Sequence, residues 1–398
     1  MKHDSLTIIA PDKSDHFDVL TDMCTKIFCW TDYFKMYAYI KDYIGNSHYD
    51  WHSSRIGLIN DQLVTHWGVF GYDTRVGSAR LRTAGIGVVL THPDYRKKGF
   101  LLKTALNSLD AARANGYDIS ILSGIPGFYH KLDYCTAWPR QNYIVGFNAL
   151  PKEKPLLKPR PYRPADFKHV CSLYNRSAAH LTGTAVRPTY NWIKNPEQAF
   201  CWHNQKGDLA GYVFFEKSNA SFQCQDAVGD PEQILRVAAW YARKHNAREI
   251  CFTLLHHLSP LARYLRSRDC RVELHYSRNG GPMARIISLA STFRKLCPEL
   301  SRRVKCSESA DWHGTLRVSF PDESVCLSIA DGSVSCVPLC STPHSISGGS
   351  ELVRLILGSD NPAAIADACC FRTSGDGARL MRVLFPVQFP MLSTSDAF

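Results

Sequence analysis

VVLTHPDYRKKGFLL, residues 88–102, joins a strand to a helix through a basic loop. The β-branched apolar run ends at a His-Pro-Asp turn, a loop of three basic residues and one glycine follows at 96–99, and an apolar segment with helical periodicity begins. The amides at the start of a helix point outward and the dipole end there is positive, so such a loop attracts anions. Gly99 lets the backbone approach a ligand closely, and the basic side chains can pair with phosphate oxygens. The sequence therefore predicts a site for a diphosphate-bearing cofactor, although many junctions of this kind bind nothing.

Two motifs in this part of the chain resemble those of the GNAT superfamily of N-acetyltransferases. The family's acyl-coenzyme A motif has Arg or Gln, two residues, Gly, one residue, and then Gly or Ala. Arg96 and Gly99 match this motif, whereas Leu101 stands where the last small residue would be. The segment GFYHKLDY, residues 127–134, resembles the second landmark, in which an aromatic pair precedes a short turn and a closing strand. The resemblance implies that acetyl-coenzyme A is bound by Val88, Val89, Leu90, Arg96, Lys97, Lys98, Gly99, Phe100 and Leu101.

Composition places the chain among ordinary soluble proteins. Its 398 residues suffice for two or three domains, and 45% of them are hydrophobic and 21% charged. We find no apolar run long enough to span a membrane and no N-terminal apolar core long enough for a secretory signal. We therefore expect a cytoplasmic protein. Its fifteen cysteines are odd in number and include no CxxC pair, which favours free buried thiols over a metal site.

The net charge of +11 raises the question of nucleic-acid binding. The basic residues are spread along the chain, however, and the densest group outside the cofactor loop lies in a proline-rich segment, residues 151–164, with the composition of a solvated linker. Composition thus disfavours a nucleic-acid partner, and salt-dependent DNA binding would reveal one. The positive charge also disfavours cationic acceptors unless their pocket is locally acidic.

Hydrophobic periodicity divides the chain into three parts. Residues 1–148 follow the acetyltransferase layout of helices, antiparallel strands, cofactor loop, helix and strand. Residues 149–289 echo that order but have Asp230 and no basic residues where the cofactor loop would be, so we expect a degenerate copy that binds no cofactor. A third pattern begins at about residue 290. Expected helices cover 16–28, 34–44, 100–114, 167–178, 231–245, 350–357 and 362–368, expected strands cover 55–59, 63–72, 79–90, 118–122, 249–255, 316–320 and 325–329, and a strand pair lies within 199–215.

This three-part organisation resembles the Eis family (enhanced intracellular survival proteins). Those proteins join an active acetyltransferase domain, a cofactor-free second copy and a C-terminal domain with a sterol-carrier-like fold. The motif LFP at 384–386 and the ending DAF at 396–398 resemble the ending of this family. The resemblance implies an α/β (α+β) fold with two tandem GNAT-like domains, the second degenerate, and a sterol-carrier-like α/β domain over 290–398 whose C-terminus reaches the active site. It also implies a homo-oligomer, a hexamer in members of the family.

The same resemblance assigns two catalytic roles. Tyr129 matches the aromatic residue that acts as general acid towards the coenzyme A thiolate, and the carboxylate of Phe398 matches the chain terminus that serves as base. A tyrosine of pKa about 10 can protonate a thiolate whose thiol has a pKa near roughly 8.5, with little driving force. An α-carboxylate of pKa about 3.5 is a poor base unless burial raises its pKa, so it can also act by orienting the amine. The alternatives are a core aromatic for Tyr129 and a frayed chain end for Phe398.

We therefore expect an acetyl-coenzyme A-dependent N-acetyltransferase without a metal, acting on an amine such as an aminoglycoside, a polyamine or a lysine side chain. The alternative is a non-catalytic coenzyme A- or lipid-binding protein on the same scaffold, which the unusual Leu101 favours. The two differ in whether Tyr129 and the Phe398 carboxylate meet near the thiol end of the cofactor slot. We expect no membrane partner.

Overall fold

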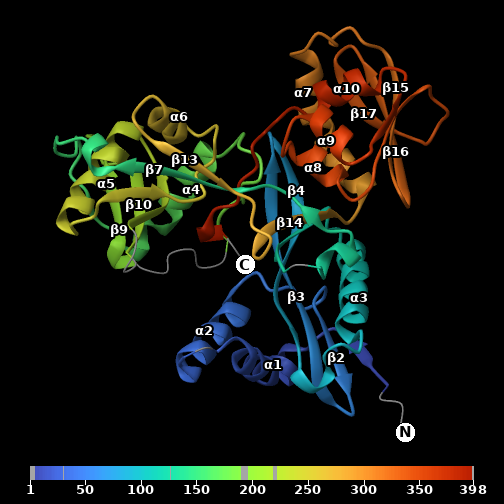
Figure 1. Cartoon of the computed structure of the whole chain (residues 1–398), viewed down its shortest axis with the longest axis horizontal. Helices are drawn as coiled ribbons and strands as arrows, with labels where there is room; N and C mark the ends of the chain where they lie inside the picture. Colours follow the sequence, from blue (N-terminus) through green and yellow to red (C-terminus); the bar gives the residue numbers. More distant parts are fainter. Residues whose placement is uncertain (1–4, 30, 126, 190–195, 218–221, 397–398) are drawn as a thin grey trace.

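The computed structural model describes residues 5–29, 31–125, 127–189, 196–217 and 222–396. They form three lobes, each built on its own β-sheet (Figure 1). The predicted α/β class is confirmed, while the sterol-carrier-like character of the last lobe stays a prediction. Within these ranges, no helix combines the length and the apolar composition that crossing a bilayer requires.

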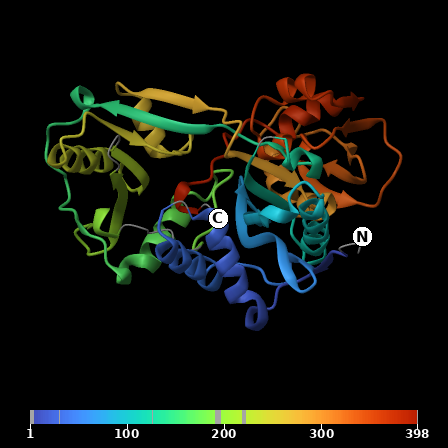
Figure 2. The ribbon, with the colours of Figure 1, turned by 60° about the horizontal axis from the view of Figure 1, so that its bottom comes forward.

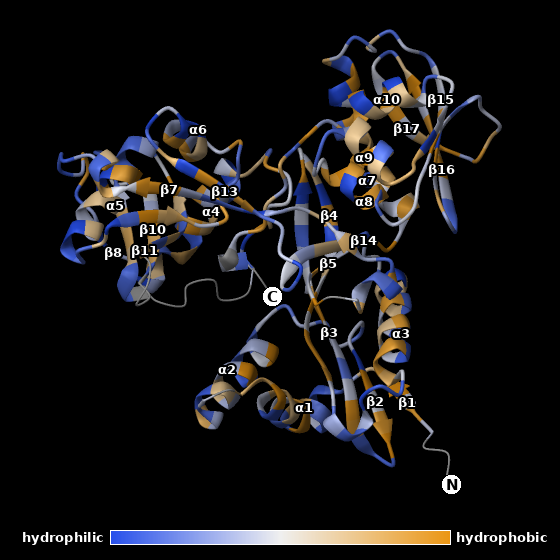
Figure 3. Cartoon of the chain, viewed as in Figure 1, coloured by the Kyte–Doolittle hydropathy of each residue, from blue (hydrophilic) through white to orange (hydrophobic). Residues whose placement is uncertain are grey.

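The first lobe is a sheet covered by helices on both faces. Its strand order is β1 (Thr7–Ile9), β2 (Arg55–Ile59), β3 (Gln62–Val76), β4 (Ala79–Thr91), β5 (Ile119–Gly124), β14 (Gly281–Ile286) and β6 (Cys135–Thr136), and its helices are α1 (Lys13–Phe28), α2 (Tyr33–Asn46) and α3 (Phe100–Ala114). Helices α1 and α2 bury one apolar cluster against the sheet, and α3 buries another. In Figure 3 the strand β2 and much of α3 carry the hydrophobic colours. All the helices and strands predicted for this lobe are present.

The second lobe repeats this plan. Its strand order is β13 (Arg271–His275), β7 (Arg140–Gly146), β12 (Glu249–Phe252), β11 (Phe222–Val228), β10 (Leu209–Lys217), β9 (Ala199–His203) and β8 (Arg160–Pro161), with helices α4 (Phe167–Ser177), α5 (Pro231–Lys244) and α6 (Pro260–Arg266). β11 and β12 are parallel, as β4 and β5 are in the first lobe. At the start of α5 the side chain of Asp230 accepts a hydrogen bond from Gln233 N at 2.9 Å. The residue that distinguishes this copy from a cofactor loop is therefore a helix cap.

The third lobe shares one hydrophobic core with the first. Its strand order is β17 (Ser333–Val337), β16 (Glu323–Ala330), β15 (Gly314–Phe320), β18 (His344–Ser347) and β19 (Arg372–Ser374), with helices α7 (Leu289–Lys305), α8 (Leu352–Leu357), α9 (Pro362–Ala368) and α10 (Gly377–Leu384). Phe293 and Leu300 of α7 pack in a single cluster with residues of both sheets. The buried carboxylate of Glu299 adds polar contacts: it accepts hydrogen bonds from Ser78 N (3.2 Å) and Oγ (2.8 Å) in the first lobe and from Arg303 Nε at 2.8 Å. Figure 2 shows these two lobes side by side.

Two strands cross the boundaries that sequence places at 148 and 289. β7 lies within 1–148 but forms part of the second sheet, between β12 and β13. β14 lies within 149–289 but completes the first sheet, between β5 and β6. The predicted ranges 1–148, 149–289 and 290–398 therefore do not coincide with the sheets. Periodicity identifies a strand but not its partner, which is why the exchange could not be predicted.

All fifteen cysteines are free thiols, and six of them are buried. Two that are at least partly exposed lie close together: the sulfurs of Cys297 in α7 and Cys336 in β17 are 3.6 Å apart. The hydrogen bond from Cys336 lowers the pKa of the Cys297 thiol to about 7. A thiolate with a thiol beside it is the arrangement that forms a disulfide on oxidation.

We expect a hydroperoxide to link these two cysteines. The thiolate of Cys297 would be oxidised to a sulfenic acid, and the Cys336 thiol would displace water from it to form the disulfide. Peptide mapping without reductant would detect the cross-linked pair, and Cys297→Ser should abolish it whereas Cys306→Ser, which removes an exposed thiol at the end of the same helix, should not. Recovery of only unlinked peptides after oxidation would refute this expectation.

Candidate active site

The predicted cofactor loop lies where two parallel strands separate. β4 and β5 pair from Thr83↔Ile119 to Ile86↔Leu122, and β4 then continues to Thr91. In the described chain, residues 87–91 of β4 therefore do not pair with β5. Peptide groups on such an unpaired edge can hydrogen-bond an amide-bearing ligand. The pantetheine arm of coenzyme A carries such amides.

A backbone irregularity marks the middle of this segment. Val88 has φ of +45°, which is rare for a β-branched residue, and the register between β3 and β4 shifts opposite it. The Val88 carbonyl lies 2.7 Å from Nδ1 of buried His66, whose Nε2 lies 2.7 Å from the hydroxyl of Tyr49. Burial lowers the pKa of His66 to about 4, so the ring is neutral. Since a carbonyl can only accept, Nδ1 carries the proton and Tyr49 donates to Nε2.

We predict that replacing His66 by alanine weakens acetyl-coenzyme A binding about tenfold, the effect of one lost hydrogen bond of roughly 1.4 kcal/mol. The Val88 carbonyl would lose its donor, and the strained segment would relax. Calorimetric titration with coenzyme A measures the affinity, and the melting temperature checks the fold. Tyr49→Phe, which removes only the support of the second ring nitrogen, should weaken binding less. Unchanged affinity in folded His66→Ala would show that Val88 does not need this contact.

The loop itself has the features of an anion site. Gly99 is left-handed (φ +77°), no atom lies within 4 Å of where a Cβ would stand, and no side chain caps α3. The first amides of α3 are thus open to a ligand. Arg96, Lys97 and Lys98 are exposed around it. The residues present fit a diphosphate.

The departure from the motif at Leu101 does not obstruct the loop. Its side chain is partly buried and packs in the cluster between α3 and the sheet, with Val89 and Trp67. Phe100 is partly buried and opens α3, and Leu90 is buried on the opposite face. The presence of Leu101, which favoured the non-catalytic alternative, is therefore explained by its packing.

Tyr129 lies in the same cluster. It begins the 3₁₀ helix η2 (Tyr129–Leu132) after β5 and is 7% exposed. Its ring centroid is 5.9 Å from that of Trp67 and 5.2 Å from that of Phe128. Burial raises the pKa of Tyr129 to about 12, so the phenol is protonated at neutral pH. The structure therefore brings Tyr129 together with Val89 and Leu101 of the predicted cofactor site.

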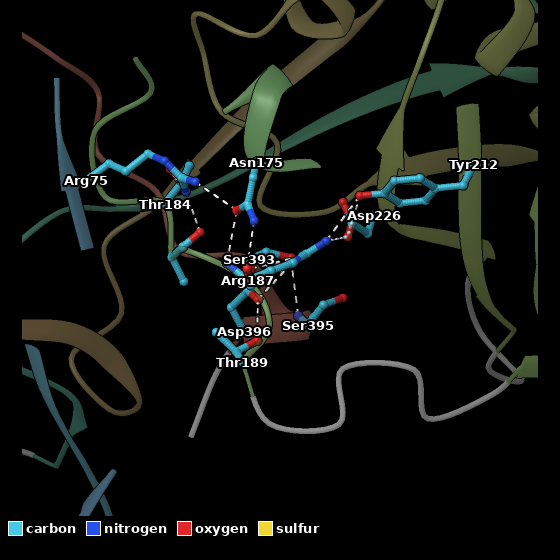
Figure 4. A network of polar contacts seen from close by, with 11 residues as sticks. Arg75, Asn175, Thr184, Arg187, Thr189, Tyr212, Asp226, Ser393, Ser395 and Asp396 are labelled. Atoms are coloured by element: carbon cyan, nitrogen blue, oxygen red, sulfur yellow. Dashed lines mark hydrogen bonds and ion pairs between the residues drawn. The ribbon is translucent and has the colours of Figure 1, made fainter. Parts of the chain in front are cut away.

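Phe398, the other predicted catalytic residue, lies outside the described residues. The chain can be followed to Asp396 in the 3₁₀ helix η6 (Thr394–Asp396), which lies between the first and second lobes (Figures 1 and 2). Asp396 is buried and pairs with Arg187. This cluster, shown in Figure 4, has no motif by which the sequence could reveal it, because its two members are 209 positions apart.

A cleft of about 510 Å³ opens at the junction of the first two lobes. Its lining contains two aspartates, two arginines and two tyrosines: Asp50, Asp73, Arg82, Arg187, Tyr72 and Tyr117. Burial would raise the pKa of Asp50, but hydrogen bonds from Ser53 and from the Tyr117 hydroxyl outweigh it and lower that pKa. Asp50 is therefore ionised at neutral pH. The described residues contain no group of three or more His, Cys, Asp or Glu side chains that could hold a metal ion.

Comparisons with known proteins agree with this geometry. Residues 13–137 match the family described as acetyltransferase (GNAT) domain. The chain contains a GNAT acetyltransferase domain. Acetyl-coenzyme A is the acetyl donor of this domain family, whose members are N-acetyltransferases. No curated protein sequence matches the chain.

Solved structures show that the likeness extends beyond the acetyltransferase domain. A GCN5-related N-acetyltransferase from Kribbella flavida superposes with a TM-score of 0.77 at 19% identity, covering 99% of this chain and 100% of that one. The corresponding values are 0.76 and 13% for a GCN5-related N-acetyltransferase from Anabaena variabilis, and 0.67 and 13% for Eis1 from Mycobacterium abscessus, with the same coverage. The chain thus has the three-lobed fold of these proteins around its acetyltransferase domain. This is the Eis-like resemblance expected from sequence.

Proposed function

We propose that this protein transfers the acetyl group of acetyl-coenzyme A to an amine acceptor, with Tyr129 as general acid and the Phe398 carboxylate as base or orienting group. The observation that carries the proposal is the separation of β4 from β5 beside an open helix start, with a protonated tyrosine in the adjoining cluster. Leu101, which favoured a non-catalytic binding protein, packs against the core, so its departure from the motif has a structural reason.

Different residues of the chain would bind the cofactor and activate the thioester. When bound, acetyl-coenzyme A supplies an activated acetyl group as a thioester. Backbone groups of Val88, Val89 and Leu90 hold the pantetheine arm and polarise the thioester carbonyl, and Arg96, Lys97, Lys98 and the amides after Gly99 bind the phosphates. The neutral amine attacks the carbonyl carbon as the carbon–sulfur bond breaks.

Two proton movements complete the reaction. The Tyr129 hydroxyl donates toward the departing sulfur, and the Phe398 carboxylate receives or orients the proton of the amine. A phenol of pKa about 12 is a weaker acid than a thiol of pKa roughly 8.5. Tyr129 thus acts chiefly by stabilising the developing thiolate through its hydrogen bond, with the proton shared in the transition state.

Two aspartates in the cleft favour a cationic acceptor. The chain's net charge of +11 would repel such a molecule, yet Asp50 and Asp73 line the cleft at the junction of the lobes. Of the two arginines that also line it, Arg187 is already paired with Asp226 and Asp396. Two carboxylates can hold the second charge of a polyamine, an aminoglycoside or a lysine-type substrate. The sterol-carrier-like third domain, the homo-oligomer and the cytoplasmic location remain part of the Eis-like proposal.

Thiol release from acetyl-coenzyme A over a panel of amines tests the proposal. The panel should contain a polyamine, an aminoglycoside and a lysine ester, with an amine-free reaction as the baseline. We expect amine-dependent release, strongest for multiply charged acceptors. Binding of acetyl-coenzyme A without turnover of any amine would instead favour the non-catalytic alternative.

A further inference from the structure

The second lobe contains its own copy of the strand separation that forms the candidate cofactor slot. Parallel pairing of β11 with β12 ends at Cys224, as pairing of β4 with β5 ends at Ile86. In both lobes the register of the preceding hairpin shifts at this point. Asp226 therefore stands in the second lobe where Val88 stands in the first, each following the last paired residue by two positions.

The chain's own C-terminal segment runs into this second separation. Met391 N donates to Thr182 O at 3.2 Å, and Met391 and Ser393 line a cavity of about 70 Å³ with residues of β11 and of the segment after β12. The 3₁₀ helix η6 follows and lies beside β11. The degenerate copy thus holds polypeptide in the region where the first lobe has its cofactor slot.

Arg187 links the C-terminal segment to strand β11. Its side chain is fully buried and contacts Asp396 of the tail through Nε (2.8 Å) and Nη2 (3.0 Å), while Nη1 lies 2.5 Å from Asp226. Thr189 Oγ1 donates to Asp396 at 2.7 Å, and the guanidinium lies 3.5 Å from the centre of the Tyr174 ring. Figure 4 shows the guanidinium between the two carboxylates.

The segment that carries Arg187 is also bound to the acetyltransferase domain. Arg75 N of β3 donates to Thr184 O at 2.9 Å, and Val186 N donates to Asp73 O at 2.9 Å. Asn175 accepts hydrogen bonds from Arg187 N (3.0 Å) and from Arg75 Nη2 (2.8 Å). The ion cluster is therefore tied to β3 at residues 73–75, which pair with Arg82 and Arg80 of β4, the strand that carries Val88 farther along.

We propose that the second lobe is a docking site for the chain's own C-terminus, in which Arg187 and Asp396 are positioning residues that aim the Phe398 carboxylate at the active site. The proposal deepens the proposed function and rests on it for the role of that carboxylate. It explains why the second copy has the aspartate Asp226 where the first lobe has Val88. The occupant of this separation carries an aspartate rather than a diphosphate, and one arginine binds both that carboxylate and the carboxylate of Asp226.

A neutral residue in place of Asp396 should weaken docking of the C-terminal segment, because the contact with Arg187 is between opposite charges. Burial alone would lower the pKa of Arg187, but the carboxylates of Asp226 and Asp396 outweigh it and raise that pKa, so the guanidinium stays charged. Asp396→Asn keeps the shape of the tail residue and removes its charge. The bidentate contact with Arg187 would be lost, and η6 would detach more often.

Release of free phenylalanine by a carboxypeptidase measures tail docking without any catalytic assay. We expect slow release from the native full-length chain and release roughly 10- to 100-fold faster from Asp396→Asn, which matches the loss of a charge-assisted hydrogen bond. In acetylation assays kcat should fall by a similar factor while KM for acetyl-coenzyme A stays unchanged. Arg187→Lys keeps the positive charge but loses the two-nitrogen contact of the guanidinium. Its rate of phenylalanine release should lie between those of the native chain and Arg187→Gln.

Arg271→Gln is the matched control. Arg271 also pairs with two carboxylates of the second lobe, Glu249 and Glu273, but at the surface, so its loss should change neither release nor kcat. Equal release from native and folded Asp396→Asn chains would overturn the docking proposal. Accelerated release from Asp396→Asn with no amine acetylated by the native chain would uphold docking and refute the proposed function instead.

Discussion

Replacement of Tyr129 by phenylalanine is expected to lower kcat about 100-fold or more, the usual contribution of a positioned acid. The ring would keep its packing against Trp67 and Phe128, so the affinity for acetyl-coenzyme A should change little. Only the hydroxyl that we propose to stabilise the departing sulfur is lost. Initial rates of thiol release with varied acetyl-coenzyme A separate kcat from KM.

A neighbouring tyrosine supplies the comparison. Tyr134 is also buried, and its hydroxyl lies 2.6 Å from Ser120 Oγ. Tyr134→Phe removes a similar hydroxyl from the same cluster and should leave kcat within a few-fold of native, about 1 kcal/mol of packing and hydrogen-bond adjustment. Similar losses in both variants would mean that Tyr129 is a core residue, the alternative that sequence left open.

Extension of the chain by a few residues beyond Phe398 is expected to lower kcat about 100-fold as well, because the terminal carboxylate becomes a peptide bond and loses its charge. The loop at Arg96–Gly99 is untouched, so binding of acetyl-coenzyme A should persist. Thiol release and a calorimetric titration on the same sample measure the two effects. The same residues added before Met1 provide the control for added length. Full turnover by the C-terminally extended chain would exclude the carboxylate from the mechanism and leave the acetyltransferase assignment in place.

Local structure could be predicted from sequence because its signals are local. The helix predicted at 100–114 is α3 with the same ends, since Gly99 precedes it in a left-handed conformation and Asn115-Gly116 follows it. The strand predicted at 55–59 is β2. Tyr129 was proposed from its place in a motif, and its catalytic role stays a prediction. Each of these inferences needs only neighbours in sequence.

Contacts between distant residues could not be predicted. The strand β14 begins with Gly-Pro and shows no clear alternation, and nothing in its sequence names β5 and β6 as partners. His66 is one histidine in an apolar strand, and its role becomes visible only when the Val88 carbonyl is seen 2.7 Å away. The pairing of Arg187 with Asp396 likewise depends on the tertiary fold.

The exchange of β7 and β14 between the two sheets limits how this gene could be divided. A product that stops at residue 148 would carry β7 without the sheet that it belongs to and would lack β14, leaving β5 and β6 with exposed edges. Exposed edges promote aggregation. Each sheet therefore needs a strand from the other part of the chain, and fragments expressed separately should regain a native fold only when both are present together.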